Sequence, residues 1–181
     1  MDDVIYIRRA LEHFKNNYPN LKTELLYFGG ARNAREFIKN VKNIGLSTNK
    51  KIIIMFDRDT EGVAGLKECI ERKDINASDN NIYHKNSFFY LLYPKTSECH
   101  KSSEFVLEDY FSKKTKARYI KQKIKSNPLD IRNFNGLGDK IKKEIRNDIN
   151  AINADEMSGF KILLNTIQSI VDNTAINVIN I

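Results

Sequence analysis

Apolar and polar positions along the first hundred residues follow two different periods. Apolar residues at helical spacing alternate with short, continuous apolar runs that are rich in β-branched and aromatic residues. This alternation is typical of an α/β fold, in which a mostly parallel sheet is flanked by helices and joined by right-handed crossovers. The predicted elements, in chain order, are helix 4–17, strand 24–28, helix 31–44, strand 52–56, helix 61–72, strand 82–83 and strand 88–93.

The pattern changes after Pro94. A polar loop and a short acidic segment, residues 103–111, lead into three predicted helices, of which the first two are rich in lysine. We therefore divide the chain into an α/β domain, residues 1–111, and a basic helical extension packed on it, residues 112–181. The three helices are expected over residues 113–125, 137–152 and 156–171, with inward faces formed by Ala117, Ile120 and Ile124, by Ile141, Ile145 and Ile149, and by Phe160, Leu163, Leu164, Ile167 and Ile170.

The strand predicted over residues 52–56 is followed by two aspartates, Asp57 and Asp59, and by Gly62. Open α/β sheets bind ligands at the carboxyl ends of their strands. Two carboxylates two residues apart can converge there on one Mg2+ ion, which prefers a few carboxylate oxygens together with water and phosphate. Two structural interpretations stay open: Asp59 or Thr60 caps the next helix, and Asp57 is an ordinary turn residue.

The positive charge of the chain is concentrated in one segment. The net charge is +7, and the stretch from Lys113 to Arg146 holds twelve Lys/Arg against three Asp/Glu, a local +9. The rest of the chain therefore carries −2. A basic segment of this kind is expected of a surface that contacts phosphate groups. The alternative is a solvated lysine-rich helical face encoded by an AT-rich gene.

Several classes of protein are not expected from this sequence. No apolar run is long enough to span a membrane, and the first residues are acidic where a signal peptide would be basic. Cys69 and Cys99 lack the spacing of metal ligands, and the three histidines are scattered. We therefore expect a cytoplasmic protein without a zinc site and without a membrane partner.

The segment Phe56-Asp57-Arg58-Asp59-Thr60-Glu61-Gly62 resembles the DxDxxG motif of Toprim domains, the metal-binding catalytic modules of topoisomerases, bacterial primases and several nucleases. The segments after it are most similar to the Toprim nucleases of the overcoming-lysogenisation-defect (OLD) family and related phage-defence proteins. The resemblance implies a Rossmann-like Toprim fold and a Mg2+ or Mn2+ cofactor held by Asp57 and Asp59.

The same resemblance implies roles for residues further along the chain. Leu107-Glu108-Asp109 matches an acidic motif, so Glu108 is expected to bind a second metal ion, with Asp109 as the alternative. A lysine that assists catalysis is assigned to Lys140, with Lys143 nearly as suitable. An acid near a helix start is also simply favoured by the helix dipole.

One part of the family pattern is absent from this sequence. Toprim domains begin with a strand that ends in Glu-Gly-x-x-Asp; Asp3 matches the final aspartate, so the glutamate would precede Met1. The chain is then a fragment, a mis-started gene, a decayed copy, or a half-domain completed by another chain or by a homodimer. Without that strand the sheet would have an open edge that invites pairing with a neighbouring chain, and cleavage would be weak or absent.

Three functions follow from these residues. The first is Mg2+-dependent cleavage of nucleic acid, more readily DNA than RNA; the second is a non-catalytic module that binds nucleic acid or a partner. The third, a haloacid-dehalogenase-type phosphatase, ranks lowest because Glu61 stands where that family needs Thr or Val. Gly62 would leave the helix amides accessible to phosphate. The residues expected to face nucleic-acid phosphates are Arg58, Lys113, Lys114, Lys142 and Lys143.

Overall fold

The chain folds into two compact units, each built from separate stretches of sequence. The computed structural model describes residues 2–43, 50–96, 105–126 and 142–181. The helical unit comprises residues 1–27 and 108–161, and the sheet unit comprises residues 28–107 and 162–181. This division differs from the predicted boundary at residue 111, since the first helix belongs with the basic helices and the last helix belongs with the sheet. Each unit is described by itself.

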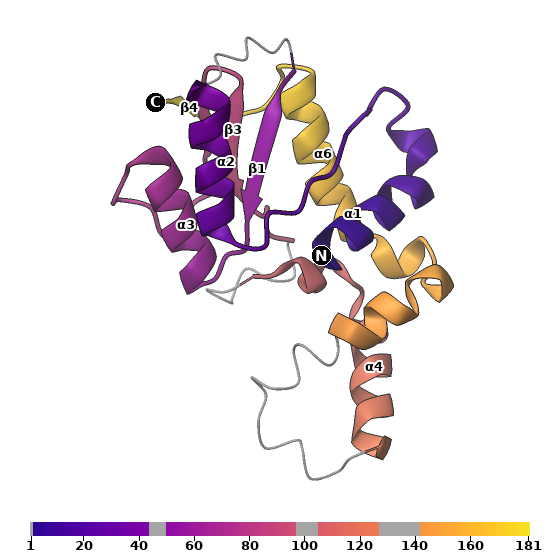
Figure 1. Cartoon of the computed structure of the whole chain (residues 1–181). Helices are drawn as coiled ribbons and strands as arrows, with labels where there is room; N and C mark the ends of the chain where they lie inside the picture. The colour runs from indigo at the N-terminus through magenta and orange to yellow at the C-terminus, as the bar shows by residue number, and fades with distance from the viewer. Residues whose placement is uncertain (1, 44–49, 97–104, 127–141) are drawn as a thin grey trace. The chain divides into compact units, whose positions relative to one another are not determined.

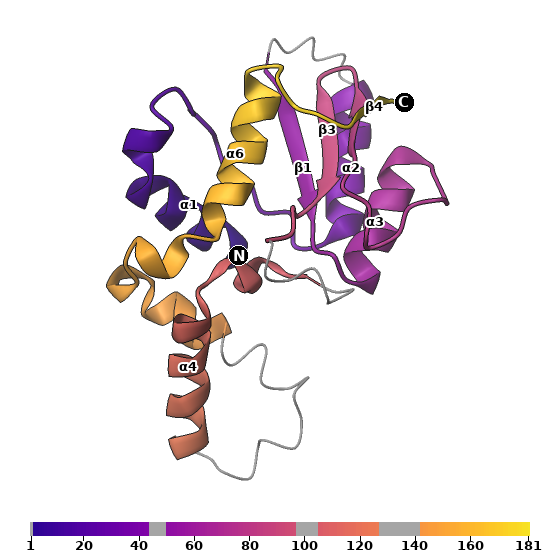
Figure 2. The same ribbon diagram turned by 180° about the vertical axis from the view of Figure 1, so that it is seen from behind.

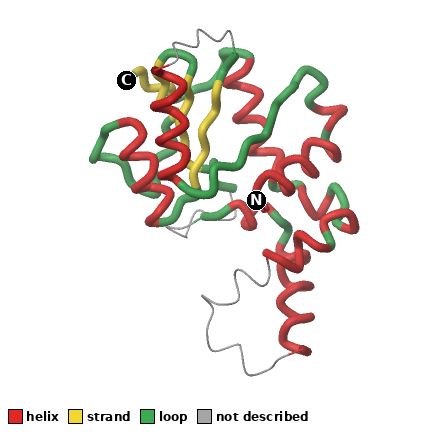
Figure 3. Tube along the Cα trace, in the orientation of Figure 1, coloured by secondary structure: helices red, strands yellow, loops and turns green. Residues whose placement is uncertain are grey.

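The sheet unit contains a four-stranded, mostly parallel, open sheet (Figures 1 and 3). Its strands are β1 (Ile52–Phe56), β2 (Ile82–Lys85), β3 (Phe88–Leu92) and β4 (Val178–Asn180), in the order β1-β3-β2-β4. β1 pairs in parallel with β3, and β2 in parallel with β4. β2 and β3 are antiparallel because only a two-residue turn joins them, which leaves no room for a crossover.

Helices cover both faces of this sheet. α2 (Ala31–Asn43) and α3 (Thr60–Ile70) pack on one face, and α6 (Phe160–Val171) packs on the other (Figures 1 and 2). Lys51, just before β1, donates hydrogen bonds from Nζ to the carbonyls of Ile170 (2.6 Å) and Val171 (2.7 Å). A lysine at the carboxyl end of a helix satisfies its last carbonyls and opposes its dipole, so this contact fixes the end of α6 beside the sheet.

Within its described residues, the helical unit contains α1 (Asp2–His13), α4 (Lys113–Ser126), a helix at residues 142–147 and three short 3-10 turns. The turns are η1 (Lys15–Asn17), η5 (Ile149–Ala151) and η6 (Asp155–Met157), and a fourth, η3 (Leu107–Tyr110), begins at the unit boundary. Its core includes an aromatic cluster: Phe111 lies edge-on to Tyr6, with ring centroids 5.1 Å apart, and to Phe160, also at 5.1 Å.

The structure confirms several predicted faces and corrects others. Ile145 and Ile149, and the five residues assigned to the inward face of the last helix, are buried. On α4 the prediction is wrong by part of a turn, because Thr115 and Tyr119 are buried whereas Ala117 is exposed. Ile141 lies outside the described residues. The tail forms β4, for which no element was predicted.

The strand predicted over residues 24–28 is absent. These residues are described as an extended segment with no place in a ladder, and Leu26 and Tyr27 are 63% and 55% exposed. The apolar composition indicates strand, but a strand needs a neighbour to satisfy its backbone groups, and the sheet of the described residues supplies none. The segment keeps strand-like extension without the hydrogen bonds of a strand.

Candidate metal site after strand β1

The residues that follow β1 form a turn that leads directly into α3; we call residues 57–62 the acidic loop. Asp59 is the N-cap of α3: its backbone is extended, and its Oδ1 accepts a hydrogen bond from the Gly62 amide at 2.7 Å. Such a bond satisfies one of the amides that a helix start leaves unpaired. The structural interpretation of Asp59 is therefore confirmed. The capping hydrogen bond uses one of the two carboxylate oxygens of Asp59, Oδ1.

Asp57 is held from the other side of the loop. Its Oδ1 accepts a hydrogen bond of 3.3 Å from the Leu107 amide, and its side chain is half-buried. Phe56, the residue before it, pairs with Tyr93 through a hydrogen bond of 2.9 Å between the Tyr93 amide and the Phe56 carbonyl. The parallel pair β1–β3 therefore continues up to the start of the acidic loop, so Asp57 lies at the carboxyl edge of the sheet, as predicted.

Gly62 is required by a close approach of two backbone segments. A Cβ added at this position would lie 2.1 Å from the Asp57 carbonyl oxygen, which no side-chain adjustment could relieve. The expectation that Gly62 leaves the helix amides accessible to phosphate is wrong for its own amide, because Asp59 accepts the Gly62 hydrogen bond. Gly62 instead lets the start of α3 pack against the backbone of the acidic loop.

Arg58 does not face phosphate or solvent, contrary to prediction. Its side chain is 1% exposed and donates hydrogen bonds to oxygens of Tyr93, Ala77, Asp79 and Asn80. An arginine between two aspartates in a charged sequence gives no sign of burial, because arginine is rarely fully buried. The inward direction of this side chain could be learned only from the structure.

The acidic loop has the donor chemistry that a hard divalent cation requires. Asp57 and Asp59 each carry a carboxylate, and Mg2+ accepts one or two carboxylates plus water and phosphate oxygens. Among the described residues there is no group of three or more His, Cys, Asp or Glu that could hold an ion. The two aspartates therefore fit an ion that keeps several waters or gains ligands from a substrate.

Glu108 of the helical unit is a buried acid with little compensation. It is 8% exposed, and neither carboxylate oxygen accepts a hydrogen bond from the described residues. Lys142 forms an ion pair with it, with Nζ 3.3 Å from Oε2. Burial raises the pKa of the Glu108 carboxyl and the negative charge of Asp3 adds to this, while Lys142 lowers it. Glu108 and the acidic loop belong to different units, so its role as a second-metal ligand stays a prediction.

The lysines predicted to act on phosphate have different surroundings. Lys140 lies outside the described residues. Lys142 is engaged with Glu108, so it differs from the exposed phosphate ligand that we predicted. Three lysines are exposed as expected: Lys113, Lys114 and Lys143.

A buried glutamate that the sequence analysis left unassigned anchors the start of α4. Glu156 accepts a hydrogen bond from Thr115 Oγ1 at 3.2 Å and forms an ion pair with Arg118 at 2.9 Å. It also exchanges hydrogen bonds with Asn153, each amide donating to the other side chain. The spacing Asn153-x-x-Glu156 is that of a capping box, so this signal was available in the sequence. Glu156 thus holds α4 through Thr115 and Arg118, while Lys113 and Lys114 of the same helix are exposed.

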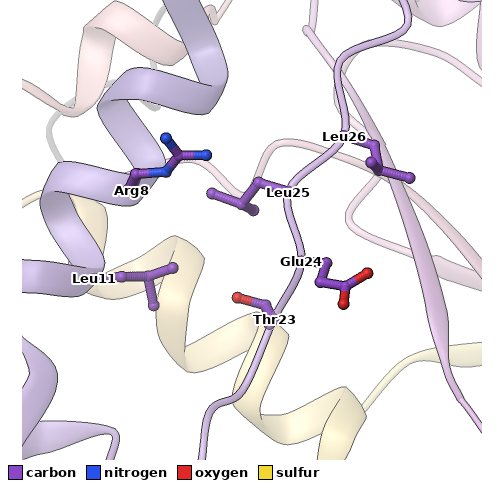
Figure 4. A pocket seen from close by; sticks show the side chains of 6 residues that line it. All are labelled: Arg8, Leu11, Thr23, Glu24, Leu25 and Leu26. Carbon is purple, nitrogen blue, oxygen red and sulfur yellow. The ribbon is translucent and has the colours of Figure 1, made fainter.

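A partly open hollow of about 440 Å³ lies in the helical unit, between α1 and the extended segment (Figure 4). Leu25 and Thr23 point toward α1 and Leu11, whereas Glu24 and Leu26 point the opposite way (Figure 4). This alternation is that of an extended chain. Two of the described lining residues are charged: Arg8 points from α1 toward the extended segment, and Glu24 points away from α1, so these two side chains do not converge (Figure 4).

Comparisons with known proteins identify no relative. No family model matches the chain, and neither the curated proteins nor the solved structures include a significant match. Among the helices that the structure describes, none has the length and apolar character needed to cross a bilayer. The class that fold and site define is thus an α/β protein with a mostly parallel open sheet and an acidic loop at the carboxyl end of β1.

Proposed function

We propose that this chain is a Toprim-type nuclease domain of the phage-defence kind, which cleaves phosphodiester bonds of nucleic acid, DNA in preference to RNA, with Mg2+ or Mn2+ in the cytoplasm. The observation that carries the proposal is the position of Asp57 and Asp59 after β1, at the carboxyl edge of a parallel strand pair. Ligands of open α/β sheets bind at this edge. The resemblance of the acidic loop to the DxDxxG motif supports the same assignment.

The two aspartates would hold the ion, each in a different way. Asp59 uses Oδ1 to cap α3, so Oδ2 is the oxygen that we expect to bind metal. Asp57 is oriented by the Leu107 amide. When bound, Mg2+ supplies a Lewis acid that stabilises charge developing on the phosphate oxygens. An exposed lysine would orient the nucleic acid through its backbone.

Nicking of supercoiled DNA tests this proposal. We expect slow conversion to the relaxed form with Mg2+ or Mn2+, none with EDTA, and loss of at least tenfold in the Asp57→Asn and Asp59→Asn variants. Asparagine caps a helix as well as aspartate does, so Asp59→Asn removes the charge and leaves the cap. Asp74→Asn, at an exposed acid of the same unit that pairs with Arg72, is the matched control. Equal nicking by all four proteins would exclude the aspartates from the reaction.

The second candidate is a non-catalytic module that binds nucleic acid through α4. The observation that favours it is the anchoring of α4: Thr115 and Arg118 bind Glu156, which leaves Lys113 and Lys114 exposed on a fixed helix. Fixed lysines bind the phosphate backbone without base specificity.

Salt-dependent binding in EDTA separates this candidate from the first. We expect measurable DNA affinity without metal. The logarithm of the binding constant should fall linearly with the logarithm of the salt concentration, and the magnitude of this slope should decrease by about two when Lys113 and Lys114 are both changed to glutamine. Changing Lys15 and Lys22 to glutamine alters the same charge at exposed positions of the same unit and serves as the control. If both pairs lower the slope equally, net charge alone accounts for the binding, and α4 is not a specific interface.

A further inference from the structure

The largest fully buried side chain among the described residues is a charged one, Arg58. It lies between the two aspartates of the acidic loop. Its guanidinium donates from Nε to the Tyr93 carbonyl, from Nη1 to the carbonyls of Ala77 (2.8 Å) and Asp79 (2.6 Å), and from Nη2 to Asn80 Oδ1 (2.7 Å). All four of these acceptors are neutral oxygens.

These bonds join the acidic loop to separate segments of the sheet unit. Tyr93 directly follows β3, and residues 77–80 belong to the connection between α3 and β2. The backbone of Arg58 adds another segment, since its amide donates to the Phe105 carbonyl at 2.7 Å and its carbonyl accepts from the Phe105 amide at 3.2 Å. Two residues further on, the Leu107 amide binds Asp57. The side chain and backbone of Arg58 thus connect the acidic loop to residues 77–80, to Tyr93 and to Phe105.

Burial of a guanidinium is expensive unless its donors are satisfied. A well-packed apolar side chain would fill the same volume without that cost, so stability by itself gives little reason for an arginine here. Arginine differs from an apolar residue in holding several acceptors in one plane at fixed angles. The acceptors of Arg58 are backbone or amide oxygens from the neighbouring connections, so the guanidinium fixes where the backbone between Asp57 and Asp59 lies.

We propose that Arg58 is a positioning residue for the metal site: its buried guanidinium sets the backbone between Asp57 and Asp59, and thereby the geometry with which the two carboxylates bind a divalent cation. This inference rests on the proposed function. Metal ligands must be held to within a fraction of an ångström, and groups behind the ligands supply that precision. Loss of such groups costs about 10- to 100-fold in metal affinity.

Direct titration of the full chain with Mn2+ tests the inference, with free Mn2+ followed by electron paramagnetic resonance. We expect Arg58→Lys to weaken Mn2+ binding at least about tenfold, since one ammonium cannot reach four acceptors in a plane. Asn80→Ala, which removes one acceptor, should weaken it less. Arg35→Lys is the matched control, because Arg35 is half-exposed and pairs with Glu68 at 3.4 Å. Circular dichroism at the titration temperature confirms that each protein is folded.

The outcomes separate this inference from the proposed function. If the wild-type chain binds no Mn2+, the proposed function fails, and the role of Arg58 fails with it. If wild type binds Mn2+ and folded Arg58→Lys binds it equally well, the proposed function stands and Arg58 is structural only. If Arg58→Lys does not fold, Asn80→Ala decides: unchanged affinity in that variant overturns the inference, and weaker binding with unchanged affinity in Arg35→Lys supports it.

Discussion

Asp59 of the sheet unit and Glu108 of the helical unit are both assigned to metal binding by the resemblance, but their carboxylates have opposite surroundings. Asp59 is partly exposed and caps a helix through one oxygen. Glu108 is buried, accepts no hydrogen bond from the described residues, and has one ion pair with Lys142. The first carboxylate has a structural task that would keep it in place without any ligand. The second has a desolvation cost that its ion pair offsets only in part.

The contrast between the two carboxylates indicates that helix capping is sufficient to explain Asp59, whereas the described part of the fold gives no such reason for Glu108. An N-cap aspartate is common, so the position of Asp59 alone is weak support for metal binding, and its second oxygen has to be tested separately. A buried acid without hydrogen bonds is uncommon and needs a reason. Glu108 is therefore the residue of the pair whose presence the fold explains less well.

The largest effect is expected from filling the space beside the acidic loop. Gly62→Ala places a methyl group against the Asp57 carbonyl, which only a backbone shift can relieve, and we expect a loss of about 3 kcal/mol in the free energy of unfolding. Gly159→Ala in the helical unit should behave alike, since its Cβ would lie 2.4 Å from the Tyr110 carbonyl oxygen.

Urea denaturation measures both glycine variants. Ala64→Gly, at an exposed position of α3, is the control and should cost about 1 kcal/mol through helix propensity alone. A Gly62→Ala variant as stable as this control would show that α3 can move away from the acidic loop.

A smaller effect is expected from removing the cap. Asp59→Ala should cost about 1 kcal/mol, while Asp59→Asn should cost only a few tenths, because the amide oxygen can accept the Gly62 hydrogen bond. The same urea experiments, run with chelator present, measure both. If the two variants lose equal stability, the charge of Asp59 matters more than its hydrogen bond, and the contrast with Glu108 is weakened.

Tyr90 of the sheet unit allows the free-energy cost of a buried, uncharged polar group without a hydrogen-bond partner to be measured. Its hydroxyl is buried with no hydrogen-bond partner among the described residues, and burial raises the pKa of Tyr90 to about 12. Tyr90→Phe should therefore be neutral or raise the free energy of unfolding by up to about 1 kcal/mol. A loss beyond 1 kcal/mol would mean that the hydroxyl is satisfied by a partner such as water.

The smallest effect is expected from Glu108→Gln at acidic pH, where both side chains are neutral, and the difference between the two proteins grows as the pH rises. Since the pKa of Glu108 is raised in the folded chain, the folded state holds its proton more tightly than the unfolded state. The stability this gives is fully present below the ordinary pKa of 4.5 and is lost as pH rises through the folded value. Glu108→Gln should lack this decline. Unfolding by urea at a series of pH values measures it, and equal slopes in both proteins would contradict the raised pKa.

Much of the fold was predictable because the spacing of apolar residues along several segments matches the pattern of buried positions in the structure. The apolar run Ile52–Phe56 forms β1, and all five residues assigned to the inward face of the last helix are buried. The predicted strand at residues 24–28 failed because strand formation depends on a neighbour that local sequence cannot reveal. The antiparallel β2–β3 pair was predictable in principle, since a two-residue connection permits no crossover.

The candidate site was predictable only as far as residue types and spacing extend. Asp57 and Asp59 lie at the carboxyl edge of the sheet as expected, and the cap interpretation of Asp59 was already open in the sequence. The burial of Arg58 depends on hydrogen bonds to residues 19 to 35 positions further along the chain. Lys142 and Glu108, which form an ion pair, are 34 positions apart. Charge counts assign such residues to the surface, so sequence reasoning misplaced both.

The sheet unit is interrupted in sequence by the whole of the second helical stretch, residues 108–161. During translation β1, β2 and β3 leave the ribosome long before α6 and β4, the elements that cover one face and pair with β2. At a synthesis rate of about 5–20 residues per second, the sheet face that α6 covers in the folded chain stays exposed for several seconds. We therefore expect nascent chains that end before residue 162 to bind chaperones and resist proteases poorly, and protection to arise abruptly once residues 162–181 have emerged.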